Sequence, residues 1–72
     1  MNIIAAFSKT TGDYLLSAWT PQEMRLRLAT YPNPDLASEI ILLIIPKERL
    51  YADRRNGRIP NVTAYPDAKS VA

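Results

Sequence analysis

Apolar residues fall into three runs along the chain, at residues 3–7, 14–19 and 40–45. The first two runs flank a polar segment, KTTGD, at residues 9–13. Two apolar runs joined by a short loop that contains glycine are typical of a β-hairpin. Side chains alternate between the two faces of a strand, and both faces of the first run are apolar. We therefore expect a sheet that is covered on both sides.

The segment after the second run carries the signals of a helix start. Thr20 is suited to be the N-cap, Pro21 to be the first helical residue, and Glu23 completes a capping box three residues after the cap. Tyr31 precedes a proline, and the residue before a proline disfavours the helical conformation. The alternation of apolar and basic residues just after Glu23 also fits a strand, but the start signal decides for a helix over residues 21–31.

The third run consists of six consecutive aliphatic residues, four of which are isoleucine. Such a run favours a strand that is buried on both faces in the middle of a sheet, and Pro46 ends it. The order of elements predicts an α+β fold, with a small antiparallel sheet in β-β-α-β order and one helix packed on one face. Because one helix covers only one face, the other face needs a second cover.

Two covers fit the sequence. The segment after the third run suits a second short helix, with Leu50 and Tyr51 pointing inward and Gly57 as its left-handed stop. The same segment also fits a hairpin with a tight turn at Asn56-Gly57. We favour the helix because Pro60 weakens the return strand. A second copy of the chain would also cover the face, and we expect a homodimer on this ground.

Chain length limits the protein to one domain. We place that α+β domain at residues 1–59. Residues 60–72 have weak patterning and are interpreted as a C-terminal tail that is partly ordered, with Val62 and Tyr65 as the residues able to dock it.

Composition narrows the chemistry, because the chain contains neither cysteine nor histidine. Disulfides, thiolate metal sites, a cysteine nucleophile and a side chain that ordinarily titrates near neutral pH are thereby excluded. The seven carboxylates are scattered without the spacing of a calcium loop. We expect no metal, no cofactor and no catalytic residue, and so a protein that is not an enzyme.

No apolar run approaches the ~20 residues that a membrane-spanning helix needs. The start of the chain lacks the basic and apolar regions of a signal peptide. We expect a cytoplasmic protein without a membrane partner.

Positive charge is concentrated in one segment. Residues 47–58 hold five basic and two acidic side chains, a net charge of +3, whereas residues 1–46 hold three basic and four acidic ones, a net charge of −1. This asymmetry favours an acidic partner, either a protein surface or a nucleic-acid backbone. The alternative is a solvated turn in which Glu48 and Asp53 neutralise the arginines locally. The predicted partner-binding residues are Tyr51, Arg54, Arg55, Arg58, Lys47 and Arg49, and the secondary interface candidates are Trp19 and Tyr31.

Three functional hypotheses follow. The first is a small binding module that occupies an acidic surface of a larger protein or ribonucleoprotein, as inhibitors of host machinery encoded by phages and mobile elements do, including inhibitors of CRISPR effectors; this comparison rests on size and composition. The second is a nucleic-acid-binding accessory protein, for which the single aromatic Tyr51 beside the arginines is a weak signal. The third is a toxin-like ribonuclease that uses Tyr51, Arg54 and Arg55.

Overall fold

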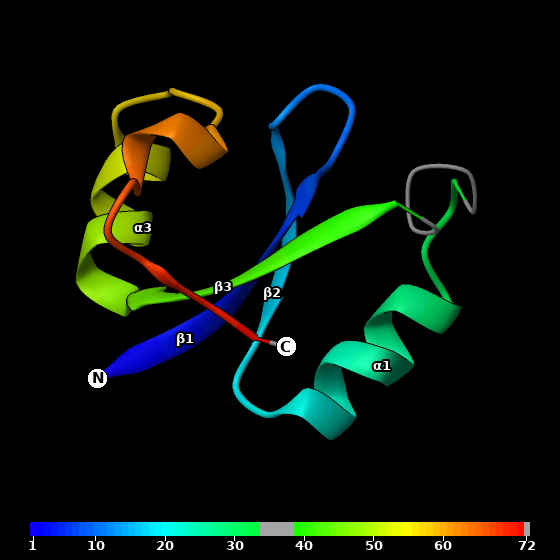
Figure 1. Ribbon diagram of the computed structural model, residues 1–72. Coiled ribbons are helices and arrows are strands. Elements are labelled where there is room, and N and C mark those ends of the chain that lie inside the picture. Colours follow the sequence, from blue (N-terminus) through cyan, green and yellow to red (C-terminus); the bar gives the residue numbers. More distant parts are fainter. Residues whose placement is uncertain (34–38, 72) are drawn as a thin grey trace.

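One antiparallel sheet organises the molecule (Figure 1). The computed structural model describes residues 1–33 and 39–71. The sheet comprises β1 (Asn2–Ser8), β2 (Tyr14–Ala18), β3 (Ile40–Pro46) and β4 (Lys69–Ser70), in the spatial order β2-β1-β3-β4. With two helices added, this is the predicted α+β fold, and the β-β-α-β order and the helix after the third strand are confirmed. The fourth strand was not predicted.

The β1–β2 hairpin forms as its sequence indicates. Gly12 adopts φ +80° and its N–H donates to the Ser8 carbonyl at 2.8 Å. The Ser8 hydroxyl accepts from the backbone N–H groups of Thr10 and Thr11, each at 3.3 Å. A glycine at positive φ and a hydroxyl that satisfies turn amides are what a tight connection between strands requires.

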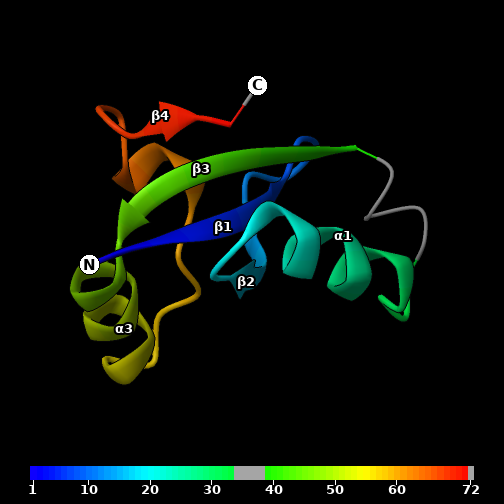
Figure 2. The same cartoon turned by 90° about the horizontal axis from the view of Figure 1, so that it is seen from below.

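Each face of the sheet has its own hydrophobic cluster and its own helix. On one face, Met24 from α1 (Pro21–Ala29) packs against Ile4, Ala6 and Ala18. On the other, Leu50 from α3 (Lys47–Arg55) packs against a cluster that also contains Phe7, Ile45 and Tyr65. Figures 1 and 2 show the strands lying between the two helices. The second helix therefore covers the face that a second copy of the chain was expected to cover. The homodimer stays a prediction, but an uncovered sheet face is no longer a reason for it.

Burial is greatest in β1 rather than in β3. All residues from 3 to 8 are buried, because β1 is paired on both sides and carries clusters on both faces. In β3, Leu43 and Ile45 are buried, but Ile44 on the opposite face remains 38% exposed. The expectation that both faces of the third strand are buried is thus wrong at Ile44, and residues 40–42 are only half-buried. Ile44 lies on the same face as α1, but α1 packs mainly against β2 and not over β3.

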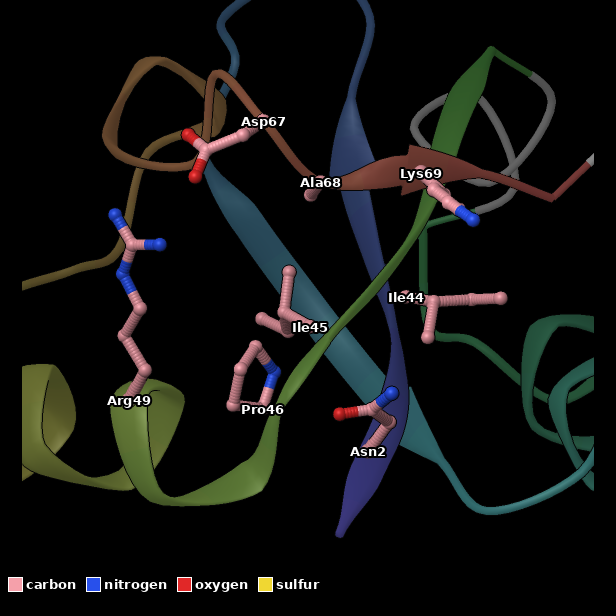
Figure 3. A pocket seen from close by; sticks show the side chains of 8 residues that line it. All are labelled: Asn2, Ile44, Ile45, Pro46, Arg49, Asp67, Ala68 and Lys69. Carbon is pink, nitrogen blue, oxygen red and sulfur yellow. The ribbon is translucent and has the colours of Figure 1, made fainter.

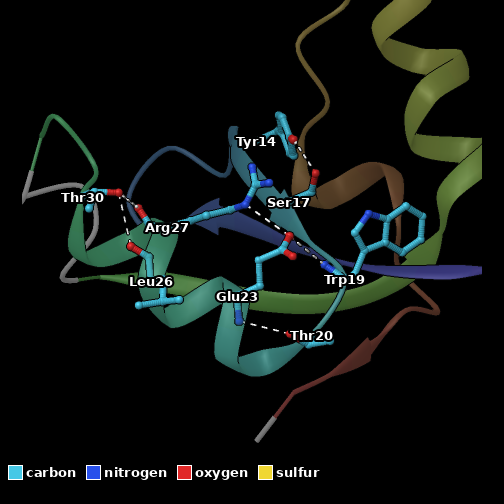
Figure 4. A network of polar contacts seen from close by, with 8 residues as sticks. All are labelled: Tyr14, Ser17, Trp19, Thr20, Glu23, Leu26, Arg27 and Thr30. Carbon is cyan, nitrogen blue, oxygen red and sulfur yellow. Dashed lines mark hydrogen bonds and ion pairs between the residues drawn. The ribbon is translucent and has the colours of Figure 1, made fainter.

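The capping box at the start of α1 is present in a modified form (Figure 4). Thr20 Oγ1 accepts from the Glu23 N–H at 3.1 Å, as predicted. The Glu23 carboxylate accepts from the Trp19 N–H at 3.4 Å and pairs with Arg27 Nε at 3.3 Å. The helix ends at Ala29, two residues before the predicted end, where the Thr30 hydroxyl donates to two carbonyls of the last turn.

The segment after β3 is helical, which settles the choice between a helix and a hairpin. Gly57 adopts φ +73° and its N–H donates to the Arg54 carbonyl at 3.1 Å, the geometry of a glycine that stops a helix. Leu50 points inward and is fully buried, but Tyr51 is 38% exposed. The expected inward orientation of Tyr51 is therefore wrong, because consecutive residues of a helix point about 100° apart and Leu50 is the residue of α3 that faces the core.

Residues 60–71 belong to the folded unit. A short 3₁₀ helix at Val62–Ala64 leads to Tyr65, which is only 2% exposed and lies against Phe7 with ring centroids 5.8 Å apart. Val62 also packs against this cluster. The two residues expected to dock the segment do so, and the domain boundary expected at residue 59 falls inside the fold.

Candidate macromolecule-binding face

Lys47, Tyr51 and Arg54 form a stripe along α3, because positions i, i+4 and i+7 share one side of a helix. Each end of the stripe meets an aromatic ring at β2. The Lys47 Nζ atom lies 5.7 Å from the centroid of the Trp19 ring, and the Arg54 Cζ atom lies 5.3 Å from the centroid of the Tyr14 ring. These cation–π contacts fix which side of α3 faces β2.

The β2 side of this seam is set by strand register. Tyr14 pairs with Phe7 and Ser17 with Ala5, so both side chains share the α3 face of the sheet. The Tyr14 hydroxyl donates to Ser17 Oγ at 3.0 Å and orients the ring that carries Arg54. In Figure 4 the side chains of Tyr14, Ser17 and Trp19 point away from α1.

Two further arginines extend the stripe. Tyr51, Arg54 and Arg55 line one shallow hollow. Arg54 also lines a second hollow together with Arg58 and Ile59, and Ile59 is 72% exposed. We refer to the combined surface as the cationic face, defined by the residues Tyr14, Trp19, Lys47, Tyr51, Arg54, Arg55 and Arg58.

The carboxylates of α3 are held away from the cationic face. Glu48 pairs with the amino terminus at 3.7 Å, and a backbone hydrogen bond, more than the neighbouring positive charges, lowers the pKa of Glu48. Asp53 accepts a hydrogen bond from the Tyr65 hydroxyl at 2.7 Å. Within residues 1–33 and 39–71, Arg54, Arg55 and Arg58 make no ion pair with a carboxylate. Neither Glu48 nor Asp53 forms an ion pair with these arginines in the described residues.

The remaining predicted site residues lie in three different places. Trp19, predicted only as a secondary candidate, joins the cationic face through Lys47. Arg49 lies on another side of α3, where its guanidinium stands over the Tyr65 ring at 4.9 Å and donates to the Ala64 carbonyl. Arg49 thus fastens the C-terminal segment. Tyr31 follows the end of α1 and is not part of the cationic face.

Tyr14 is not among the site residues predicted from the sequence. The only sequence signal for Tyr14 at an interface is its position. Tyr14 and Trp19 stand at the two ends of the second apolar run, where an aromatic side chain can lie at the surface and not in the core. Their contact with α3 depends on the packing of that helix, which no local pattern specifies.

A separate groove of about 350 Å³ lies beside β3 and β4 (Figure 3). Its floor is apolar, with Ile44 and Pro46, and its charges are mixed. Lys69 points away from Arg49 and Asp67 in Figure 3, and Arg49 is already engaged by Tyr65. The groove therefore concentrates neither sign of charge, in contrast to the cationic face.

The described residues show neither a metal-binding cluster nor a membrane-spanning helix. Among them, no group of three acidic, histidine or cysteine side chains is arranged to hold a metal ion. None of their helices has the length and apolar character needed to cross a bilayer.

No protein family, curated protein or solved structure was found to match this chain. Its function is therefore inferred from the geometry and charge of the cationic face.

Proposed function

We propose that this protein is a non-enzymatic binding module that docks its cationic face onto an acidic surface of a larger macromolecule. The observation that carries the proposal is that Arg54, Arg55 and Arg58 have no carboxylate partner in the described structure, although two carboxylates lie on the same helix. Unpaired cations gathered on one side of a small protein create a local positive potential that attracts acidic partners.

The face is also partly ordered before binding. Tyr14 holds Arg54 by a cation–π contact, and Trp19 holds Lys47 in the same way. Long basic side chains lose conformational entropy when they bind, and side chains that are already restrained lose less of it. Arginine, tyrosine and tryptophan are also the residues that most often dominate binding energy at interfaces.

Paired triple variants test the proposal. The first replaces Arg54, Arg55 and Arg58 by alanine; the control replaces three exposed basic residues outside the face, Lys9, Arg25 and Lys69, and so removes the same charge. Tagged parent and variants are used to capture macromolecules from a lysate, with and without nuclease treatment. We expect the first variant to capture at least tenfold less of the partner than the parent does, and the control to capture as much as the parent. Equal capture by both triple variants would contradict the proposal.

The side chains of the cationic face do not suit the alternative function of a ribonuclease. Acid–base catalysis needs a group that exchanges a proton readily near neutral pH. The cationic face offers arginine, lysine, tyrosine and tryptophan side chains, whose ordinary pKa values lie far above that range or which do not titrate. We therefore expect purified protein to leave labelled single-stranded RNA intact over hours. Cleavage that Arg54→Ala abolishes would show that the protein is an enzyme.

A further inference from the structure

Rings and cations alternate along the cationic face. Trp19 and Lys47 form one end, Arg54 and Tyr14 the other, and Tyr51 lies between the two cations on α3. Trp19 is 45% exposed and Tyr51 38% exposed. Lys47 and Arg54 lie about 10 Å apart along the helix axis, so the alternating rings and cations extend over a short distance.

Tyr51 differs from the other two rings. The rings of Tyr14 and Trp19 each carry a cation, whereas in the described structure the Tyr51 ring contacts neither a cation nor another aromatic ring. An exposed ring without such a partner, flanked by unpaired cations, is suited to stack on a planar group attached to an acidic backbone.

Two classes of acidic partner fit the charge, a protein surface and a nucleic acid. The centre of a protein–protein interface is usually depleted of charged residues, lysine in particular, although arginine is enriched there together with aromatic side chains. Here four basic side chains lie around Tyr51, with Lys47 and Arg54 on either side of it along α3, and Ile59 is the only strongly exposed aliphatic residue that lines the adjoining hollow. Interfaces with nucleic acid are more positively charged and use aromatic rings to stack on bases.

The exposed rings also indicate whether the nucleic acid is single-stranded or double-stranded. Bases in a duplex are stacked on each other, so their faces are not accessible to a tyrosine side chain. Bases of a single strand are accessible, and stacking on them tolerates any sequence because every base has an aromatic face.

We propose that the partner of the cationic face is single-stranded nucleic acid, with the Tyr51 ring stacked on a base and Lys47, Arg54, Arg55 and Arg58 contacting phosphates. This inference rests on the proposed function, since it names the acidic macromolecule that the face binds.

The first test measures binding of defined probes. A labelled 12-nucleotide oligouridylate and a labelled 12-residue polyglutamate are titrated with the protein, and anisotropy is followed at several salt concentrations. For binding to a single strand, log K falls by about 0.7 per tenfold increase in salt for each phosphate contact. Four contacts therefore predict a slope of log K against log salt of about −3. Trp19 is the only tryptophan, and we expect its emission to change when oligouridylate binds. Polyglutamate should bind at least tenfold more weakly.

The second test separates stacking from charge. Tyr51→Ala should weaken oligouridylate binding ~5-fold to ~160-fold, because stacking of one base contributes about 1–3 kcal/mol. The matched control Tyr51→Phe keeps the ring and should bind within about twofold of the parent. Arg55→Ala should reduce the salt slope by about 0.7.

The outcomes distinguish this inference from the proposed function. Failure of the parent to bind oligouridylate, or unchanged binding by Tyr51→Ala, overturns the inference. Polyglutamate binding as tight as that of oligouridylate also overturns it, and would indicate an acidic protein as partner. The proposed function falls only if the arginine triple variant and its control capture the same macromolecules equally well.

Discussion

Tyr65 joins the C-terminal segment to the rest of the fold, and its replacement by phenylalanine isolates the contribution of one hydroxyl group. The side chain is buried, its hydroxyl donates to Asp53 Oδ2 at 2.7 Å, and its ring lies against Phe7 and beneath Arg49. Tyr65→Phe preserves these ring contacts and removes only the hydrogen bond.

The expected cost follows from the surroundings of Asp53. A hydrogen bond to a charged group contributes about 1.5–3 kcal/mol when both partners are shielded from water. Asp53 is only partly buried, so water replaces part of the lost interaction. We therefore expect Tyr65→Phe to lower the free energy of unfolding by about 1–2 kcal/mol at pH 8, with the fold retained.

The pH dependence has a definite sign. Burial, and next the hydrogen bond to Asp53, raise the pKa of Tyr65 above its ordinary value. A group whose pKa is raised by folding stabilises the native state fully below its unfolded pKa, which is about 10 for tyrosine. Above that pH the unfolded chain loses its proton first, and the native state loses about 1.4 kcal/mol per pH unit. The difference in the free energy of unfolding between the parent and Tyr65→Phe should therefore shrink as the pH rises from 10 to 11.5.

Urea unfolding, followed by circular dichroism at pH 8, 9, 10, 10.5, 11 and 11.5, measures the difference between parent and variant. Contributions from the other tyrosines cancel in that difference. Tyr51→Phe, at an exposed tyrosine, serves as the matched control and should differ little from the parent throughout. If the difference between parent and Tyr65→Phe stays constant from pH 8 to 11.5, the reasoning about Tyr65 is wrong.

Two further predictions concern stability. Leu43→Ala should lower the free energy of unfolding by about 2–5 kcal/mol, while Ile44→Ala at the neighbouring, partly exposed position should cost much less; equal costs in urea denaturation would contradict the difference in burial. Gly57→Ala should cost about 1–2 kcal/mol from its positive φ alone, because no atom lies within 4 Å of the added Cβ. Gly12→Ala should cost more, because its Cβ would also lie 2.9 Å from the side-chain amide of Asn61; thermal melts that rank the two glycine variants in the reverse order would refute this.

Local features of the fold were determined by the sequence alone. The hairpin followed from Gly12 between two apolar runs, and the start of α1 from Thr20, Pro21 and Glu23. A helix at the position of α3 was favoured over a hairpin because Pro60 weakens a return strand, whereas Gly57 fits either structure. Each of these signals acts between residues within a few positions of one another, where backbone conformation and capping are decided by short-range sterics and hydrogen bonds.

Features that join distant parts of the chain were decided only by the tertiary structure. Exposure of Ile44, burial of Tyr65 and the pairing of β4 with β3 depend on how far α1, α3 and the C-terminal segment extend over the sheet. The candidate site shows the same division. Its arginines were visible in the sequence, but the contacts of Lys47 with Trp19 and of Arg54 with Tyr14 were not. They arise because α3 packs beside β2, a strand that lies far away in the sequence, and such packing is set by the whole core rather than by any local pattern.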